Sequence, residues 1–161
     1  MAIAAQAANY VWQKAKISLD TLAASPAARA AFRELKTQLA GVKGNPDLQF
    51  IPVTAAQMIA NGGYCPDVDA CRLYGAYFKG ARTSGTTAAF VAIHDATDNS
   101  ATTTTVLTGK LKVTGEEVTF VSQFGWGIAT DITVACATAV GGATESSVGD
   151  AANGFLIIAD E

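Results

Sequence analysis

Apolar and small polar residues alternate along several short segments between Tyr74 and Ile158. A period of two directs one face of each segment inward and the other toward solvent, as in the strands of a half-buried sheet. Turn-forming pairs such as Asp98-Asn99 and Gly141-Gly142 separate the segments. The pattern predicts a mainly β fold, an antiparallel β-sandwich of the jelly-roll type, for residues 47–161.

Residues 1–46 follow a helical pattern instead. A broad apolar face predicts a helix over residues 4–24. Ser25 and Pro26 are a favoured N-cap and first helical residue, and they predict a second helix that ends at Gly41. The apolar face of the second helix consists of Ala28, Phe32, Leu35 and Leu39. The two helices together predict an N-terminal hairpin or arm.

Gly, Asn and Pro interrupt the chain at residues 42–47, so the boundary between arm and sandwich is predicted near residue 46. Leu48–Val53 follows with a strand-like composition, and Pro52 favours an edge strand. Thr54 and Gln57 match a capping box, which predicts a short helical turn.

The helical arm allows two interpretations. It packs on the sandwich of its own chain, or it docks on a partner or on copies of itself. The second interpretation selects five apolar side chains as candidates for assembly or attachment. They are Tyr10, Trp12, Phe32, Leu35 and Leu39.

Composition narrows the function. Only 16% of the residues are charged, against about 25% in an average domain, which suggests that other molecules cover part of the surface. The net charge of -3 and the lack of a Lys/Arg cluster argue against nucleic acid as a partner. No apolar stretch is long enough to span a bilayer and no secretory signal is present, so we expect a soluble protein without a membrane partner.

Cys65 and Cys71 are spaced so that they can close a small disulfide loop; in a reducing cytosol they would stay thiols. Cys136 lies in a strand-like segment and is expected as a buried thiol, with pairing to a neighbouring subunit as the alternative. A zinc site would have to recruit Cys136 and His94 from distant strands, and none is expected. Asp67 and Asp69 lack the further acidic ligands of a calcium loop.

Catalysis is not expected. His94 and Asp95 are adjacent on a strand, so they point to opposite faces and cannot form the pair of a catalytic triad. His94 is instead expected at a strand end, facing solvent or a subunit. Glu116 and Glu117 are neighbours in a predicted turn, where a pair of glycosidase carboxylates cannot be assured. We therefore predict a protein that is not an enzyme and has no cofactor and no metal.

Trp126 stands between two glycines that let it turn inward, or outward against a partner. Together with Tyr74 and Tyr77 it forms a set of candidate partner-contact aromatics, which could also stack on a saccharide.

The strand region resembles the small β-sandwich virion proteins of tailed bacteriophages, of the capsid-decoration or head-fibre kind. The resemblance covers residues 71–158. It lies in Phe90-Val91-x-Ile93-x-Asp95, in Gly127-Ile128-x-Thr130-x-Ile132-Thr133-Val134, and in Gly149-Asp150 before the last strand.

This resemblance implies a non-enzymatic capsid decoration protein that is assembled in the host cytoplasm and exposed on the particle exterior. Its implied partners are copies of itself, with a trimer favoured, and the major capsid protein or another virion protein. The alternative is a receptor- or carbohydrate-binding sandwich of a head or tail fibre.

Overall fold

A computed structural model gives the fold for residues 2–40, 47–58, 63–66, 68–80, 89–97, 105–111, 116–137 and 152–160. The helices are α1 (Ala2–Thr21), α2 (Pro26–Ala40) and α3 (Ala55–Met58). The strands are β1 (Leu48–Val53), β2 (Cys71–Gly80), β3 (Ala89–Asp95), β4 (Thr105–Leu111), β5 (Glu117–Ile128), β6 (Ile132–Ala137) and β7 (Ala152–Asp160).

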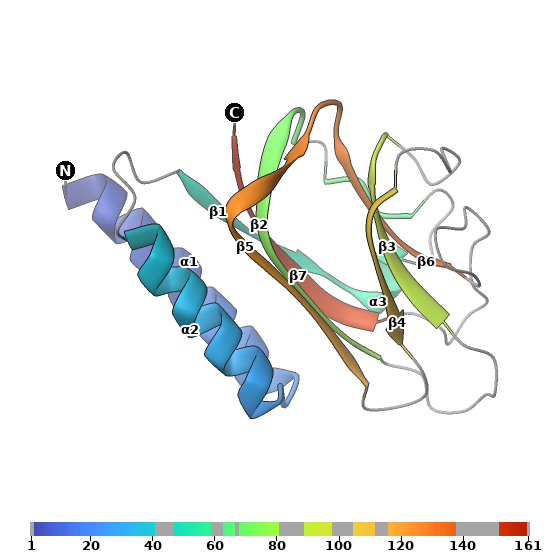
Figure 1. The fold of residues 1–161 in the computed structure, drawn as a ribbon, viewed down its shortest axis with the longest axis horizontal. Coiled ribbons are helices and arrows are strands. Elements are labelled where there is room, and N and C mark those ends of the chain that lie inside the picture. Colours follow the sequence, from blue (N-terminus) through green and yellow to red (C-terminus); the bar gives the residue numbers. More distant parts are fainter. Residues whose placement is uncertain are drawn as a thin grey trace.

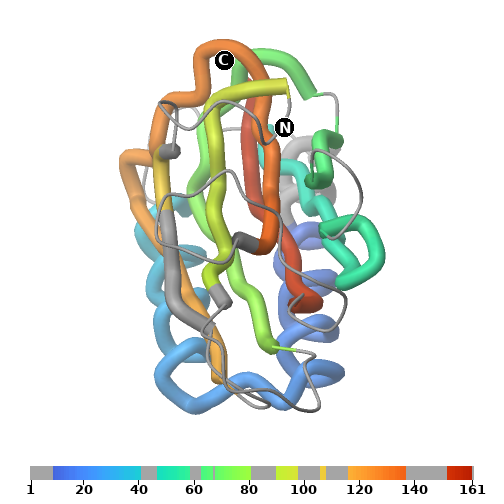
Figure 2. Tube along the Cα trace, turned by 90° about the vertical axis from the view of Figure 1, so that its right-hand side faces the viewer, coloured from blue at the N-terminus to red at the C-terminus, as the bar shows by residue number. Residues whose placement is uncertain are grey.

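The elements form three layers (Figure 1). The first sheet has the order β1-β7-β2-β5, the second has the order β4-β3-β6, and every described strand pair is antiparallel. The helices α1 and α2 cover the outer face of the first sheet, and the second sheet packs on its inner face. Figure 2 shows the second sheet in front and the helix pair behind. The predicted antiparallel sandwich with an N-terminal helical hairpin is confirmed; the jelly-roll topology stays a prediction.

In the turn between the helices, the end of α1 and the start of α2 are each capped by hydrogen bonds. Ala23 adopts a left-handed conformation with φ of 51°. The Ala23 amide donates to the Asp20 carbonyl and the Ala24 amide donates to the Leu19 carbonyl, which is the Schellman arrangement that ends a helix. The Ala28 amide donates to Ser25 Oγ at 3.1 Å, so the predicted N-cap of the second helix is confirmed.

A bulge in β2 determines which of its side chains point to each face of the first sheet. The register shifts between Leu73 and Gly75. Without this shift Leu73 and Phe78, five positions apart, would point to opposite faces. With it, both side chains lie in the apolar cluster between the two sheets.

A second apolar cluster lies between the helices and the first sheet. The helices contribute buried side chains that include Phe32, Leu35 and Leu39, and the sheet contributes Tyr77 and Phe155. The rings of Phe32 and Phe155 are 5.2 Å apart, at a distance where aromatic rings attract one another. The helix pair is therefore a layer of the folded chain, sharing an apolar core with the sheet.

Two further predictions from the sequence hold. Pro52 lies in β1, at the edge of its sheet, the position in a sheet where proline is tolerated. The Thr54 amide donates to Gln57 Oε1 at 2.8 Å and the Gln57 amide donates to Thr54 Oγ1 at 3.3 Å, so the capping box opens α3. The predicted boundary near residue 46 and the helix end at Gly41 lie outside the described residues.

Candidate interaction surfaces

The residues considered for chemistry do not come together in the part of the chain that the structure describes. No group of three or more His, Cys, Asp or Glu side chains that could hold a metal ion occurs there. Asp67 lies outside that part. Cys65 is half-buried, and Cys71 and Cys136 are buried. The Cys65–Cys71 disulfide stays a prediction.

His94 differs from its expected position. Its exposed fraction is 0%, so it does not face solvent at a strand end. The neighbouring Asp95 has a structural part, because its carboxylate accepts the amides of Ala129 and Thr130 at 2.9 and 2.7 Å. Burial would raise the pKa of Asp95, but these hydrogen bonds outweigh it and hold that pKa below its ordinary value. Asp95 thereby fixes the corner where the chain passes from β5 to β6.

Four residues tie the helix turn to the first sheet, and we call them the hairpin clamp: Ser25, Tyr77, Lys79 and Glu117. Glu117 Oε2 accepts the Tyr77 hydroxyl at 2.7 Å and the Ser25 amide at 3.0 Å. Lys79 Nζ donates to the Ala23 carbonyl at 2.9 Å. The clamp fixes the end of the hairpin, in addition to the apolar cluster along its length.

The pKa values of Glu117 and Tyr77 shift in opposite directions within the clamp. Burial would raise the pKa of Glu117, but the hydrogen bonds from Ser25 and Tyr77 and the nearby charge of Lys79 outweigh it and lower that pKa. Burial, with the hydrogen bond to Glu117 and the negative charge of that group, raises the pKa of Tyr77 above its ordinary value. Within the clamp, Glu117 is therefore a carboxylate and Tyr77 a neutral phenol.

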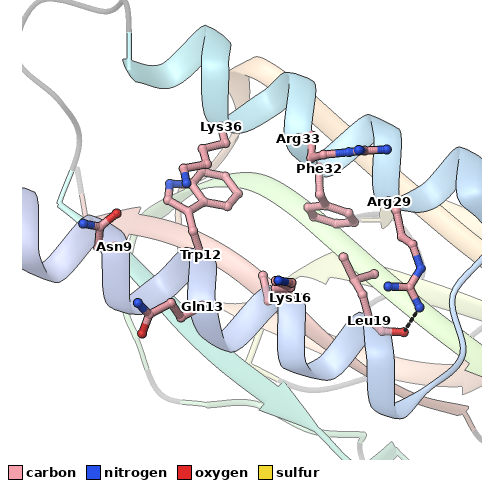
Figure 3. Close-up of a pocket in the computed structure, with 10 residues that line it drawn as sticks. Asn9, Trp12, Gln13, Lys16, Leu19, Arg29, Phe32, Arg33 and Lys36 are labelled. Carbon is pink, nitrogen blue, oxygen red and sulfur yellow. Dashed lines mark hydrogen bonds between the residues drawn. The ribbon is translucent and has the colours of Figure 1, made fainter.

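Between the outer sides of α1 and α2 runs a groove of about 380 Å³ (Figure 3). Its apolar part is formed by Trp12 and Leu19 of α1 and Phe32 of α2. In the described part of the chain, all charged side chains that line it are cations. These cations are Lys16, Arg29, Arg33 and Lys36. We call the whole groove between α1 and α2 the interhelical groove.

Of these cations, Arg29 is engaged within its own chain. It pairs with the Asp20 carboxylate, and its guanidinium donates to the carbonyls of Leu19 and Ala24 at 3.3 and 3.1 Å. Arg29 thus satisfies carbonyls at the end of α1. Lys16, Arg33 and Lys36 are exposed and make no ion pair with a described residue.

The predicted assembly residues separate into two groups. Phe32, Leu35 and Leu39 are buried against the first sheet, so in this fold they serve the core of their own chain. Tyr10 is 59% exposed, and Trp12 is partly buried in the interhelical groove. An attachment role for the set therefore depends on Tyr10 and Trp12.

The predicted contact aromatics also separate. The prediction for Tyr77 needs correction, because its exposed fraction is 0% and its hydroxyl belongs to the hairpin clamp. Tyr74 and Trp126 are partly buried and keep some exposed surface. Their role as contacts stays a prediction.

Phe124 is a surface residue that sequence reasoning missed. In the ladder of β2 with β5, Val121 pairs with Gly75 and Trp126 with Leu73, so residues 122–125 bulge from the edge strand. Phe124 lies on this bulge and is 77% exposed. Gly125 beside it has φ of 70°, and the Arg72 guanidinium donates to the Phe124 carbonyl at 3.2 Å. The Phe-Gly pair that interrupts the strand alternation was the available signal.

The chain matches no protein-family model, no curated protein and no solved structure. No helix among the described residues is both long and apolar enough to cross a membrane.

Proposed function

We propose that this protein is a non-enzymatic virion structural protein that decorates the outer surface of a phage head, with its helix pair as the attached face. The observation that carries the proposal is the construction of that pair. Two helices are fixed to a sheet by a buried apolar layer and by the hairpin clamp. A rigid face of this kind loses little conformational entropy when it docks on a lattice.

The outer side of α1 suits such docking. Tyr10 and Ile17 are each 59% exposed, and they lie seven residues apart, about two helical turns, on one side of the helix. Neither of them lines the interhelical groove, to which the same helix contributes Trp12, Gln13 and Lys16. Association of copies, with a trimer favoured, belongs to the same proposal and accords with the low charged fraction of 16%.

Particles purified on a density gradient from a culture of the source organism test this role. We expect mass spectrometry to find the chain in the particle fractions at a fixed ratio to the main shell protein, and nuclease treatment to leave it there. Finding the chain only in fractions without particles would contradict the proposal.

A second candidate function is receptor or carbohydrate binding at a head or tail fibre, and the exposed Phe124 favours it. Aromatic faces stack on sugar rings, and the partly exposed Tyr74 lies beside the same bulge, next to Gly125. Trp126 instead packs against the apolar cluster between the two sheets. A glycan array probed with the intact protein and with Phe124→Ala tests this candidate. Saccharide binding that is lost in Phe124→Ala supports it, and an array without binding excludes the saccharides tested.

A further inference from the structure

The charge of the chain is unevenly divided along its sequence. Residues 1–46 carry six Lys or Arg residues and only two acidic ones, which gives them a net charge of +4 within a chain of -3. Residues 47–161 therefore carry -7. The basic residues are Lys14, Lys16, Arg29, Arg33, Lys36 and Lys43, and the acidic ones are Asp20 and Glu34.

We propose that the interhelical groove binds a short acidic peptide segment of a partner protein, one with an aromatic or aliphatic side chain among its carboxylates. Lys16, Arg33 and Lys36 would face the carboxylates, and Trp12 would receive the apolar side chain, with the largely buried Phe32 at the base of the groove. Clusters of Arg and Lys recognise acidic motifs in this way, through charge-assisted hydrogen bonds.

The dimensions of the groove agree with a short segment. From Trp12 to Leu19, α1 rises by about 10 Å. An extended peptide covers that length in about three residues. Arg33 and Lys36, three residues apart on α2, lie on the same side of that helix and can contact neighbouring carboxylates.

Nucleic acid is a weaker occupant for the same groove. Specific nucleic-acid sites neutralise on the order of six to ten phosphates. The groove offers Lys16, Arg33 and Lys36, since Arg29 is engaged by Asp20. The charge of -7 on residues 47–161 would also repel a polyanion.

A labelled peptide tests the proposal directly. The probe is a fluorescein-labelled octapeptide of six glutamates and two phenylalanines, titrated with the intact protein at low salt and followed by fluorescence anisotropy. We expect Lys16→Glu and Lys36→Glu each to weaken binding by about tenfold, through loss of attraction and added repulsion. Salt should weaken binding to the unsubstituted protein.

Lys14→Glu is the matched control, because Lys14 is an exposed cation of the same helix that does not line the groove. We expect it to change the affinity by less than about twofold. Circular dichroism should show the same helix content in all variants. An unsubstituted protein that does not bind the peptide, or a Lys14→Glu variant that loses as much affinity as Lys16→Glu, would overturn the proposal.

Other occupants give other results. Tighter binding of a labelled single-stranded oligonucleotide than of the peptide would assign the groove to nucleic acid. A dimer mass in light scattering that falls to the monomer mass in Lys16→Glu and not in Lys14→Glu would assign it to a second copy. Either result overturns the peptide proposal.

The inference rests on the proposed function only in taking the partner to be a particle protein. A chain that binds the peptide but is absent from particles keeps the groove and loses the virion role. A chain that is present in particles but does not bind the peptide keeps the virion role and loses the groove proposal.

Discussion

At the scale of single residues, Glu117 holds the helix turn to the sheet. Glu117→Gln removes the negative charge that accepts the Ser25 amide and the Tyr77 hydroxyl. We expect the free energy of unfolding at pH 7 to fall by about 1–3 kcal/mol, as for hydrogen bonds to a charged group. Urea denaturation measures the change. Glu34→Gln, at an exposed carboxylate of α2, is the control and should change it by less than about 0.5 kcal/mol.

The pH dependence of stability follows from the lowered pKa of Glu117. A carboxylate whose pKa is lower in the folded state stabilises the fold fully above its ordinary pKa, near 4. That stabilisation is lost as the pH falls through the lower, folded value. Denaturation midpoints between pH 7 and pH 2 should therefore decrease less steeply in Glu117→Gln than in the unsubstituted protein. Parallel curves would show that Glu117 is not coupled to folding.

Ala23 gives a prediction of opposite sign. Its left-handed conformation, with φ of 51°, suits glycine better than alanine. Ala23→Gly should therefore raise the free energy of unfolding by about 1 kcal/mol. Ala30→Gly, in the exposed middle of α2, should lower it by about 1 kcal/mol. Thermal denaturation of the two variants separates the effects, and a loss in both would mean that Ala23 is not strained.

Local rules explain which residues the sequence could predict. Ser25 caps α2 through its own hydroxyl, and Thr54 and Gln57 cap α3 through neighbours three residues apart, so each is visible in a short window. Glu117 is 92 residues from Ser25. Nothing local to Glu117 distinguishes it from a turn residue, and its role depends on the tertiary fold.

At the scale of elements, α2 packs closely on β2 at Gly75. A Cβ atom there would lie 2.9 Å from Phe32 Cε1 and 3.2 Å from Leu35 Cδ2, closer than such atoms normally pack. We expect Gly75→Ala to push α2 from the sheet and to lower the free energy of unfolding by about 1–3 kcal/mol, as overpacking does.

Gly127→Ala in β5 is the matched control for that change. A Cβ atom at Gly127 meets nothing within 4 Å. The substitution should be neutral or slightly stabilising, because alanine loses less conformational entropy on folding than glycine. Urea denaturation of both variants decides the matter, and equal effects would contradict the close approach of α2 to β2.

Alternation of apolar and small polar residues identified β3 and β6, although residues 91–94 and 132–136 are buried on both faces. The pattern is harder to interpret where both faces carry large apolar side chains. In β7, Phe155 and Ile157 face the helices while Leu156 and Ile158 face the second sheet, so the apolar run is continuous. The bulge between Leu73 and Gly75 shifts the phase of β2 in mid-strand. The resulting position of Tyr77 on the helix-covered face could not be derived from a period of two.

At the scale of the whole molecule, the helix layer and the sandwich should fold as one unit. A variant that lacks residues 1–46 would expose the apolar outer face of the first sheet, which includes Leu48, Tyr77, Phe155 and Ile157. We expect this variant to aggregate or to bind a hydrophobic dye, since large exposed apolar patches promote association. Light scattering coupled to size exclusion measures this. A well-folded monomer would contradict the shared core.

The two sides of the molecule differ, because the helices cover one face of the first sheet and the second sheet covers the other. Residues 1–46 carry a net charge of +4 and residues 47–161 carry -7, so the basic residues are concentrated in the N-terminal part of the chain. An orientation with the helices toward the head follows from the proposed attachment, and it directs the second sheet outward.

A density map of the purified particle by electron cryomicroscopy tests the proposed attachment most directly. The predicted result is a copy of this fold on the outer surface, with α1 and α2 against the shell and an acidic segment of a shell protein in the interhelical groove. A map in which the helix pair faces solvent, or in which the fold is absent from the particle, would contradict it.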